Sequence, residues 1–199
     1  DNGSVALPAD PRHAPYTQFS FARFAIPALA GYQGRAVYMD SDMLVFRDFA
    51  ELWQLPFDGA KVLIEIGSRD QRDRGKHTAV MLLDCARLDW RVDAIVADLG
   101  RRYDYNALMA VDPLLAPGEM VERIPAGWND LDRFDPERTR NLHYTEIRTQ
   151  PWVTAGHPLG HLWTAELKCA IDAGAISTNL VHEEIAAGYA RPSLALELG

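Results

Sequence analysis

The sequence has few cysteines, no long apolar run and no excess of positive charge, and each shortage excludes a class of protein. Its two cysteines, Cys85 and Cys169, lack metal-binding spacing, and we interpret both as core residues rather than as a disulfide. No apolar run is long enough to cross a bilayer and no signal peptide is recognisable, so the cytoplasm is the default compartment. The formal net charge of -8 argues against broad nucleic-acid binding, which needs a basic face.

What the sequence does have is the composition and patterning of one globular domain. Of its 199 residues, 48% are hydrophobic and 24% charged, so we expect a single domain over residues 1–199, with 1–15 as an irregular lead-in. Strand-like segments alternate with helical ones, which predicts an α/β fold with a largely parallel sheet. The predicted strands are 36–39, 60–66, 78–84, 119–125 and 141–144, and the main predicted helices are 16–30, 90–99, 162–173 and 179–187.

Two aspartates one residue apart follow the first predicted strand, in "RAVYMDSDMLV". In open α/β sheets, ligands bind beyond the carboxyl ends of strands, so we expect Asp40 and Asp42 at that edge. Burying a carboxylate is costly unless it is paired or binds a metal. Two carboxylates with one spacer suit Mg²⁺ or Mn²⁺, and a solvated turn with a helix cap explains the same pattern equally well.

A histidine follows another short apolar segment, in "NLHYTEIRTQPW". His143 would therefore also lie at the end of a strand. Its imidazole would suit Mn²⁺ better than Mg²⁺. A histidine in this position is more often a structural residue than a ligand, so the motif alone leaves both interpretations open.

Five segments in a fixed order make the pattern more specific. They are "FSFARFAIPALAG", "RAVYMDSDMLVFRDFAELW", "AVMLLD", "IPAGWN" and "HYTEIRTQPW". Together, over residues 16–163, they resemble glycosyltransferase family 8, the retaining sugar transferases that include glycogenin and bacterial galactosyltransferases of lipopolysaccharide. The resemblance implies a GT-A-like fold with a mainly parallel sheet, a nucleotide-diphosphate sugar donor that is most often a UDP-sugar, a carbohydrate or hydroxyl acceptor, and Mn²⁺ or Mg²⁺ as cofactor.

The same resemblance assigns roles to individual residues. Asp40 and Asp42 match the metal-binding Asp-x-Asp motif, and His143 matches the third protein ligand. Arg23 matches the helix arginine that faces the donor, and Asn129 matches an asparagine near the active site. The chemistry agrees, because a departing diphosphate needs its charge neutralised by a cation and by arginine.

Several positions depart from the family pattern. Gln150 stands where the family has a lysine that reaches the diphosphate, and Arg148 would supply that charge unless it is only a solvated arginine. His77 replaces an asparagine that touches the donor sugar. Near the reacting carbon, Asp104 is kept, where it would orient hydroxyl groups, and Tyr105 replaces a glutamine. Without the resemblance, Asp104 would be interpreted as a helix cap.

The largest departure concerns the front of the chain. A GT-A domain normally opens with a strand-helix-strand unit that holds the nucleoside base, whereas only the lead-in precedes the arginine segment here. We therefore expect this unit to be shortened, absent or encoded in sequence beyond these residues. Whether these 199 residues bind a nucleotide depends on which of the three alternatives is true.

Two other functions remain open from the sequence. The first is a catalytically degenerate GT-A-like domain that binds carbohydrate or a partner. The second is a haloacid-dehalogenase-like phosphatase, in which the first aspartate of Asp-x-Asp is the nucleophile. The phosphatase also needs a downstream lysine and a later acidic pair at a strand end, and the sequence provides neither in that setting.

Overall fold

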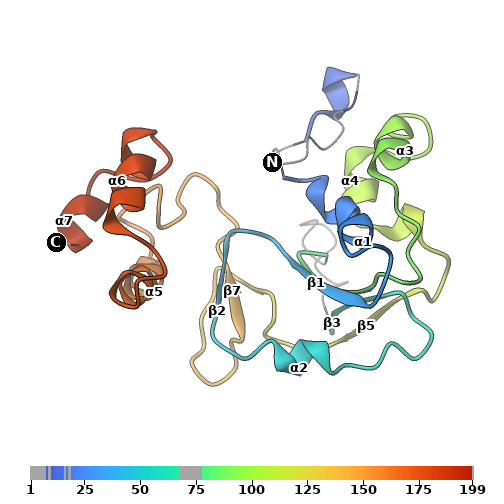
Figure 1. Cartoon of the computed structure of the whole chain (residues 1–199), viewed down its shortest axis with the longest axis horizontal. Coiled ribbons are helices and arrows are strands. Elements are labelled where there is room, and N and C mark those ends of the chain that lie inside the picture. The colour runs from blue at the N-terminus through green and yellow to red at the C-terminus, as the bar shows by residue number, and fades with distance from the viewer. Residues whose placement is uncertain (1–7, 9, 16, 18, 68–77, 199) are drawn as a thin grey trace. The chain divides into compact units, whose positions relative to one another are not determined.

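The computed structural model describes residues 8, 10–15, 17, 19–67 and 78–198 (Figure 1). The chain divides into two compact units, and each is described by itself. The first comprises Asp1–Ser41 and Arg47–Asn129, and the second comprises Asp42–Phe46 and Asp130–Gly199. The single domain expected over residues 1–199 stays a prediction.

The first unit is built on a four-stranded sheet with the order β1-β4-β3-β5. Its strands are β1 (Arg35–Met39), β3 (Val62–Glu65), β4 (Val80–Asp84) and β5 (Met120–Ile124). β3 pairs with β5 in parallel, and β4 pairs with both β1 and β3 in antiparallel fashion. Strands β1, β3 and β5 therefore share one direction, and β4 is the departure from the predicted mainly parallel sheet. Its apolar residues would pack equally well in either direction, so the pattern does not encode this reversal.

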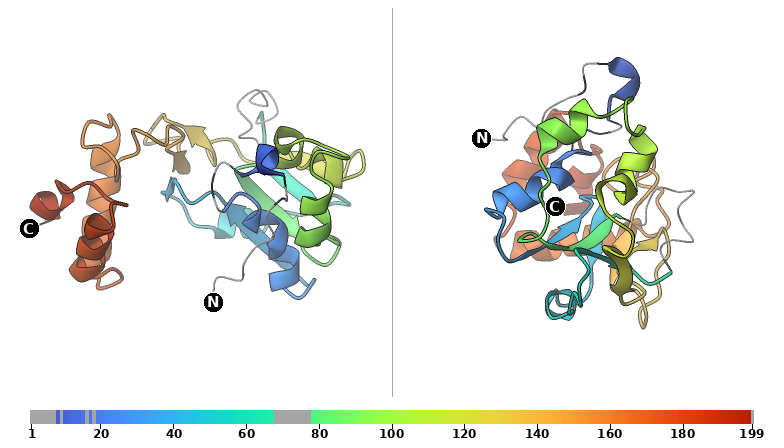
Figure 2. Two further views of the ribbon diagram at one scale, coloured as in Figure 1. Left: turned by 90° about the horizontal axis from the view of Figure 1, so that it is seen from above. Right: turned by 90° about the vertical axis from the view of Figure 1, so that its right-hand side faces the viewer.

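Helices cover both faces of this sheet, which confirms the predicted α/β class. Helices α1 (Ile26–Leu29), α3 (Val92–Ala97) and α4 (Tyr105–Met109) lie on one side, and α2 (Ala50–Trp53) lies on the other (Figures 1 and 2). The main core lies between the sheet and the three-helix side, because alternate residues of β3 and β4 point there. Its fully buried members include Phe24, Val62, Ile64, Met81, Leu83 and Leu108.

The helix predicted over residues 16–30 is largely wrong. The described part of that range holds a 3-10 turn, η2 (Ala22–Ala25), followed by α1. Pro27 lies in the first turn of α1, where its missing N–H is not needed. Gly31 and Gly34 follow the helical segment, with φ angles of 64° and 60° that favour glycine.

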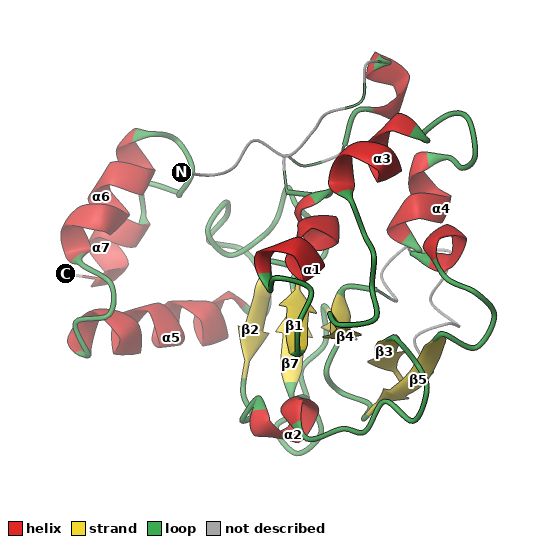
Figure 3. Cartoon of the chain, turned by 45° about the vertical axis from the view of Figure 1, so that its right-hand side comes forward, coloured by secondary structure: helices red, strands yellow, loops and turns green. Residues whose placement is uncertain are grey.

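The second unit holds a three-stranded sheet and the C-terminal helices (Figure 3). The strands are β2 (Met43–Val45), β6 (Asp130–Leu131) and β7 (Asn141–His143), in the order β2-β7-β6. Helices α5 (Gly160–Asp172), α6 (Thr178–Ala186) and α7 (Leu194–Leu198) follow. Among the described residues, no helix is long and apolar enough to span a membrane.

We predict that truncating the core of the first unit is strongly destabilising. Leu83 on β4 is fully buried, so Leu83→Ala should lower the free energy of unfolding by about 2–5 kcal/mol through lost burial and a residual cavity. Leu29→Ala is the control, because Leu29 is 84% exposed and its truncation should change stability by less than about 0.5 kcal/mol. Urea denaturation followed by circular dichroism measures both, and equal losses would contradict the prediction.

Candidate functional site

Asp40 lies directly after β1, at the carboxyl end of the strand, as the sequence predicts. Its main-chain N–H donates to the carbonyl of Ala79 at 3.0 Å, which extends the pairing of β1 with the approach to β4. Its side-chain Oδ1 receives hydrogen bonds from Arg23 Nη2 at 3.0 Å and from the Tyr38 hydroxyl. Asp40 is therefore a carboxylate held in place by two neighbours, and not a solvated turn residue.

Arg23 is buried, with 7% of its surface exposed, so it is not a surface arginine. Its guanidinium lies 4.6 Å from the centre of the Tyr38 ring and donates to Thr78 Oγ1 at 3.2 Å. Burial of a charge is costly unless the charge is paired, and the ion pair with Asp40 supplies that pairing. Arg23, Tyr38, Asp40 and Thr78 thus form one connected group at the edge of the sheet.

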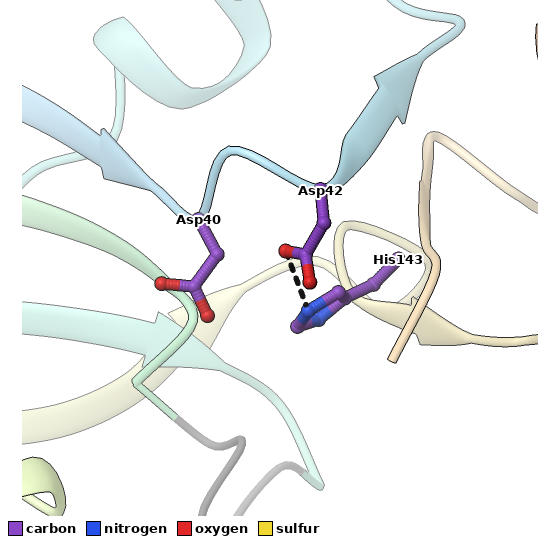
Figure 4. A group of neighbouring side chains, drawn as sticks. All are labelled: Asp40, Asp42 and His143. Atoms are coloured by element: carbon purple, nitrogen blue, oxygen red, sulfur yellow. Dashed lines mark ion pairs between the residues drawn. The ribbon is translucent and has the colours of Figure 1, made fainter. Parts of the chain in front are cut away.

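Asp42 and His143 come together in the second unit through the pairing of β2 with β7. Met43 lies opposite His143 in this pairing, and the main-chain N–H of Tyr144 donates to the Asp42 carbonyl at 2.9 Å. This register places His143 Nε2 3.1 Å from Asp42 Oδ1, as Figure 4 shows. His143 is the last residue of β7, as the sequence predicts, and it is completely buried.

Gln150 is a site residue whose role the sequence did not reveal. It is buried, and its side-chain amide donates to Asp42 Oδ2 at 3.0 Å and to the Tyr144 carbonyl at 2.8 Å. The resemblance treats this position as a lost lysine, whereas in the structure the amide orients the Asp42 carboxylate. No sequence signal joins residues 42 and 150, because their contact depends on the fold.

Tyr144 packs beside this pair without taking part in acid–base chemistry near neutral pH. Burial raises the pKa of its phenol to about 12, and its hydroxyl donates to the Leu159 carbonyl at 3.1 Å. Trp152 meets the Tyr144 ring edge-on and contacts Trp163. These aromatic contacts make a small core behind His143.

The Asp-x-Asp motif carries chemical groups that suit a divalent cation. Asp40 follows the first unit's strand β1 and carries carboxylate oxygens, while Asp42 and His143, paired within the second unit, carry carboxylate oxygens and an imidazole nitrogen. Such a mixed oxygen and nitrogen set fits Mn²⁺, and also Mg²⁺ with more oxygen ligands from water or substrate. The residues therefore fit the cofactor that the resemblance implies, without identifying the metal.

Asn129 lies in the loop after β5, with only 2% of its surface exposed. The main-chain N–H groups of Gly127, Trp128 and Asn129 all donate to the carboxylate of Glu65, the last residue of β3. Trp128 is completely buried and stacks on Phe49, so it belongs to the core. Glu65 was not identified from the sequence, although a charged residue ending an apolar strand was a visible signal.

Asp104 and Tyr105 lie at the start of α4. Asp104 is the N-cap of α4, where its Oδ1 accepts from the Ala107 N–H at 2.8 Å. Tyr105 donates its hydroxyl to Ser20 at 2.9 Å. Arg148 is exposed in the turn after β7, and His77 lies outside the described residues.

Comparison with known proteins finds one family and one curated relative that are similar to this chain. The model of glycosyl transferase family 8 matches residues 7–99, a little under half of the chain. Protein CDI of Arabidopsis thaliana is 25% identical over 179 residues, which cover 76% of this chain and 65% of that protein. The chain therefore spans less than two thirds of that relative.

Two solved structures resemble the fold. A galactosyltransferase, LgtC, in complex with donor and acceptor sugar analogues matches with a TM-score of 0.53 and 17% identity, covering 86% of this chain and 71% of that one. The bifunctional glycosyltransferase WbbM matches with a TM-score of 0.48 and 16% identity, covering 75% and 37%. The LgtC match shows that the fold is GT-A-like. Within that class, the family match confirms the resemblance to glycosyltransferase family 8.

We predict that Asp104 stabilises α4 as its cap. Asp104→Ala removes the acceptor for the Ala107 N–H and should lower the free energy of unfolding by about 1 kcal/mol. Asp104→Asn is the matched variant, because asparagine caps helices about as well as aspartate, and it should be nearly neutral. Thermal or urea unfolding of both variants measures this, and an equal loss would show that charge matters and not capping.

Proposed function

We propose that this chain is a metal-dependent glycosyltransferase that moves a sugar from a nucleotide-diphosphate donor, a UDP-sugar, to an acceptor hydroxyl with retention. The observation that carries the proposal is the pairing of Asp42 with His143, whose Oδ1 and Nε2 atoms lie 3.1 Å apart. Two residues before Asp42 in the chain, Asp40 forms an ion pair with Arg23 at 3.0 Å. This is the donor set that a cation and a diphosphate require. The family match and the GT-A-like fold support the same activity and favour it over the phosphatase.

Asp40, Asp42 and His143 are the proposed ligands of the cation, with Mn²⁺ preferred because imidazole suits it better than Mg²⁺. When bound, the cation supplies positive charge that offsets the negative charge developing on a departing diphosphate. Gln150 holds Asp42 through its amide, so it keeps one carboxylate oriented without adding charge. A carboxylate fixed in this way loses less freedom when it binds.

The remaining proposed roles concern the donor and the reacting carbon. Arg23 adds positive charge at the donor site and holds Asp40 through their ion pair. Arg148 is exposed and would meet the diphosphate by charge alone, and His77 would touch the donor sugar. Asp104 and Asn129 are proposed to orient hydroxyl groups near the reacting carbon. Asp104→Asn keeps the cap, so lower turnover at unchanged stability supports its role and unchanged turnover removes it from the site.

The alternative is a domain that binds a nucleotide or carbohydrate without transferring sugar. Gln150 favours it, because an amide bound to Asp42 cannot supply the positive charge of the family lysine. The two functions differ in turnover. A transferase should release nucleoside diphosphate from a sugar donor, and NMR of the product should show the donor's anomeric configuration. Binding without any release would establish the alternative.

The first test is Mn²⁺-dependent binding of UDP to the full chain by calorimetry. We expect binding to require Mn²⁺ and to vanish in Asp42→Ala, because that variant removes one proposed ligand and the partner of His143. Asp172→Ala is the matched control, since Asp172 is an exposed aspartate at the end of α5 and should leave binding unchanged. Binding that persists in Asp42→Ala, or that ignores Mn²⁺, would overturn the proposed site.

A second prediction concerns Gln150. Gln150→Met keeps most of the side-chain volume but removes the hydrogen bond to Asp42, so Mn²⁺ affinity should fall about 10-fold to 100-fold. Ile147→Ala is the control, because Ile147 is exposed in the neighbouring turn. Electron paramagnetic resonance titration of free Mn²⁺ measures both affinities. Unchanged affinity in Gln150→Met would show that the amide packs against Asp42 without orienting it.

A further inference from the structure

Glu65 is a buried carboxylate outside the proposed set of ligands. It is the last residue of β3 and only 4% of its surface is exposed. Its Oε1 atom receives three main-chain N–H groups, from Gly127 at 2.6 Å, Trp128 at 3.0 Å and Asn129 at 3.3 Å. Hydrogen bonds to an ionised acceptor are stronger than neutral ones, so together they offset the cost of burying this charge.

The three donors are consecutive in the chain and converge on one oxygen atom. Consecutive N–H groups arranged in this way form an anion-binding concavity, and here the anion is a side chain of the same protein. Gly127 has a φ of 94°, in the left-handed region that glycine adopts without strain. Two features therefore fix the conformation of the 127–129 loop, the left-handed backbone of Gly127 and the carboxylate of Glu65 that accepts its N–H groups.

This contact decides where the loop after β5 lies. Strands β3 and β5 are parallel, and β1 runs in their direction. Glu65 at the end of β3, the 127–129 loop after β5 and Asp40 after β1 therefore lie at the same edge of one sheet. Asn129 is both the third donor to Glu65 and a buried side chain at that edge. Moving the loop would move Asn129.

We propose that Glu65 is a positioning residue, which fixes the Gly127–Asn129 loop and thereby holds Asn129 where the site needs it. The part that concerns catalysis rests on the proposed function, in which Asn129 orients a hydroxyl group. The part that concerns the loop does not depend on any activity. Glu65 itself acts through the main chain and touches no substrate in this proposal.

The loop part is tested by amide hydrogen exchange, followed by NMR on the full chain. In Glu65→Gln, which keeps the shape but loses the charge, the amides of Gly127, Trp128 and Asn129 should exchange about tenfold faster. Glu122→Gln makes the same chemical change at an exposed position of β5 and should leave them unchanged. Unchanged exchange in Glu65→Gln would overturn the proposal.

A second variant, in the loop instead of at Glu65, distinguishes a loosened loop from a misfolded chain. Gly127→Ala strains the left-handed backbone while keeping Glu65, so the amides of Trp128 and Asn129 should again lose protection. The amides of β3 and β4 should stay protected in both variants, which shows that the sheet is intact. Loss of protection throughout the sheet in both variants would mean that Glu65 maintains the fold and not the loop, and would also overturn the proposal.

The catalytic part is tested by a double-mutant cycle on turnover. If Glu65 acts through Asn129, Glu65→Gln should lower kcat with the donor KM unchanged, and adding it to Asn129→Ala should cause no further loss. Independent, multiplicative losses would overturn the link to Asn129. A wild-type chain that binds the donor but has no turnover would refute the proposed function alone, because the exchange measurements would still decide the loop.

Discussion

The ion pair between Arg23 and Asp40 is the interaction on which the first unit's contribution to the site depends. It joins a 3-10 turn near the front of the described chain to the residue that ends β1, and Thr78 before β4 holds the same guanidinium. Removing one partner of a buried pair typically costs about 3–5 kcal/mol, because the other charge is left without compensation. The position of Asp40 is therefore secured by folding itself, before any ligand binds.

The same edge of the sheet holds a second carboxylate by a different physical means. Asp40 is matched by a guanidinium and a hydroxyl, both from side chains, whereas Glu65 is matched by three main-chain N–H groups. Side-chain partners can be exchanged by mutation, while main-chain donors depend only on the path of the loop. A substitution such as Gly127→Ala would therefore disturb Glu65 without altering any atom of its donors.

The sequence predicts those parts of this arrangement that depend on local patterns. The strand before Asp40, the apolar strands β3 and β4 and the strand end at His143 follow from short apolar segments. In each case the deciding information lies within a few residues of the feature.

The parts that the sequence did not predict depend on contacts between distant residues. The helix expected over residues 16–30 matched a helical spacing, but Pro27 favours the first turn of a helix, which shortened the element. Strands β2 and β6 are too short to show a periodic pattern, and only their pairing with β7 defines them. Gln150 and Asp42 are 108 residues apart, so their contact is visible only in the fold.

The candidate residues differ in how many side-chain partners hold each of them in place. Asp42 lies 3.1 Å from an imidazole and accepts from an amide, and Asp40 accepts from a guanidinium and a hydroxyl, so each carboxylate is oriented by side-chain partners. Arg148 is exposed, and Asp104 caps its own helix, α4. Since a preorganised group loses less entropy on binding, the firmly held residues are the ones that can bind a cation at low cost.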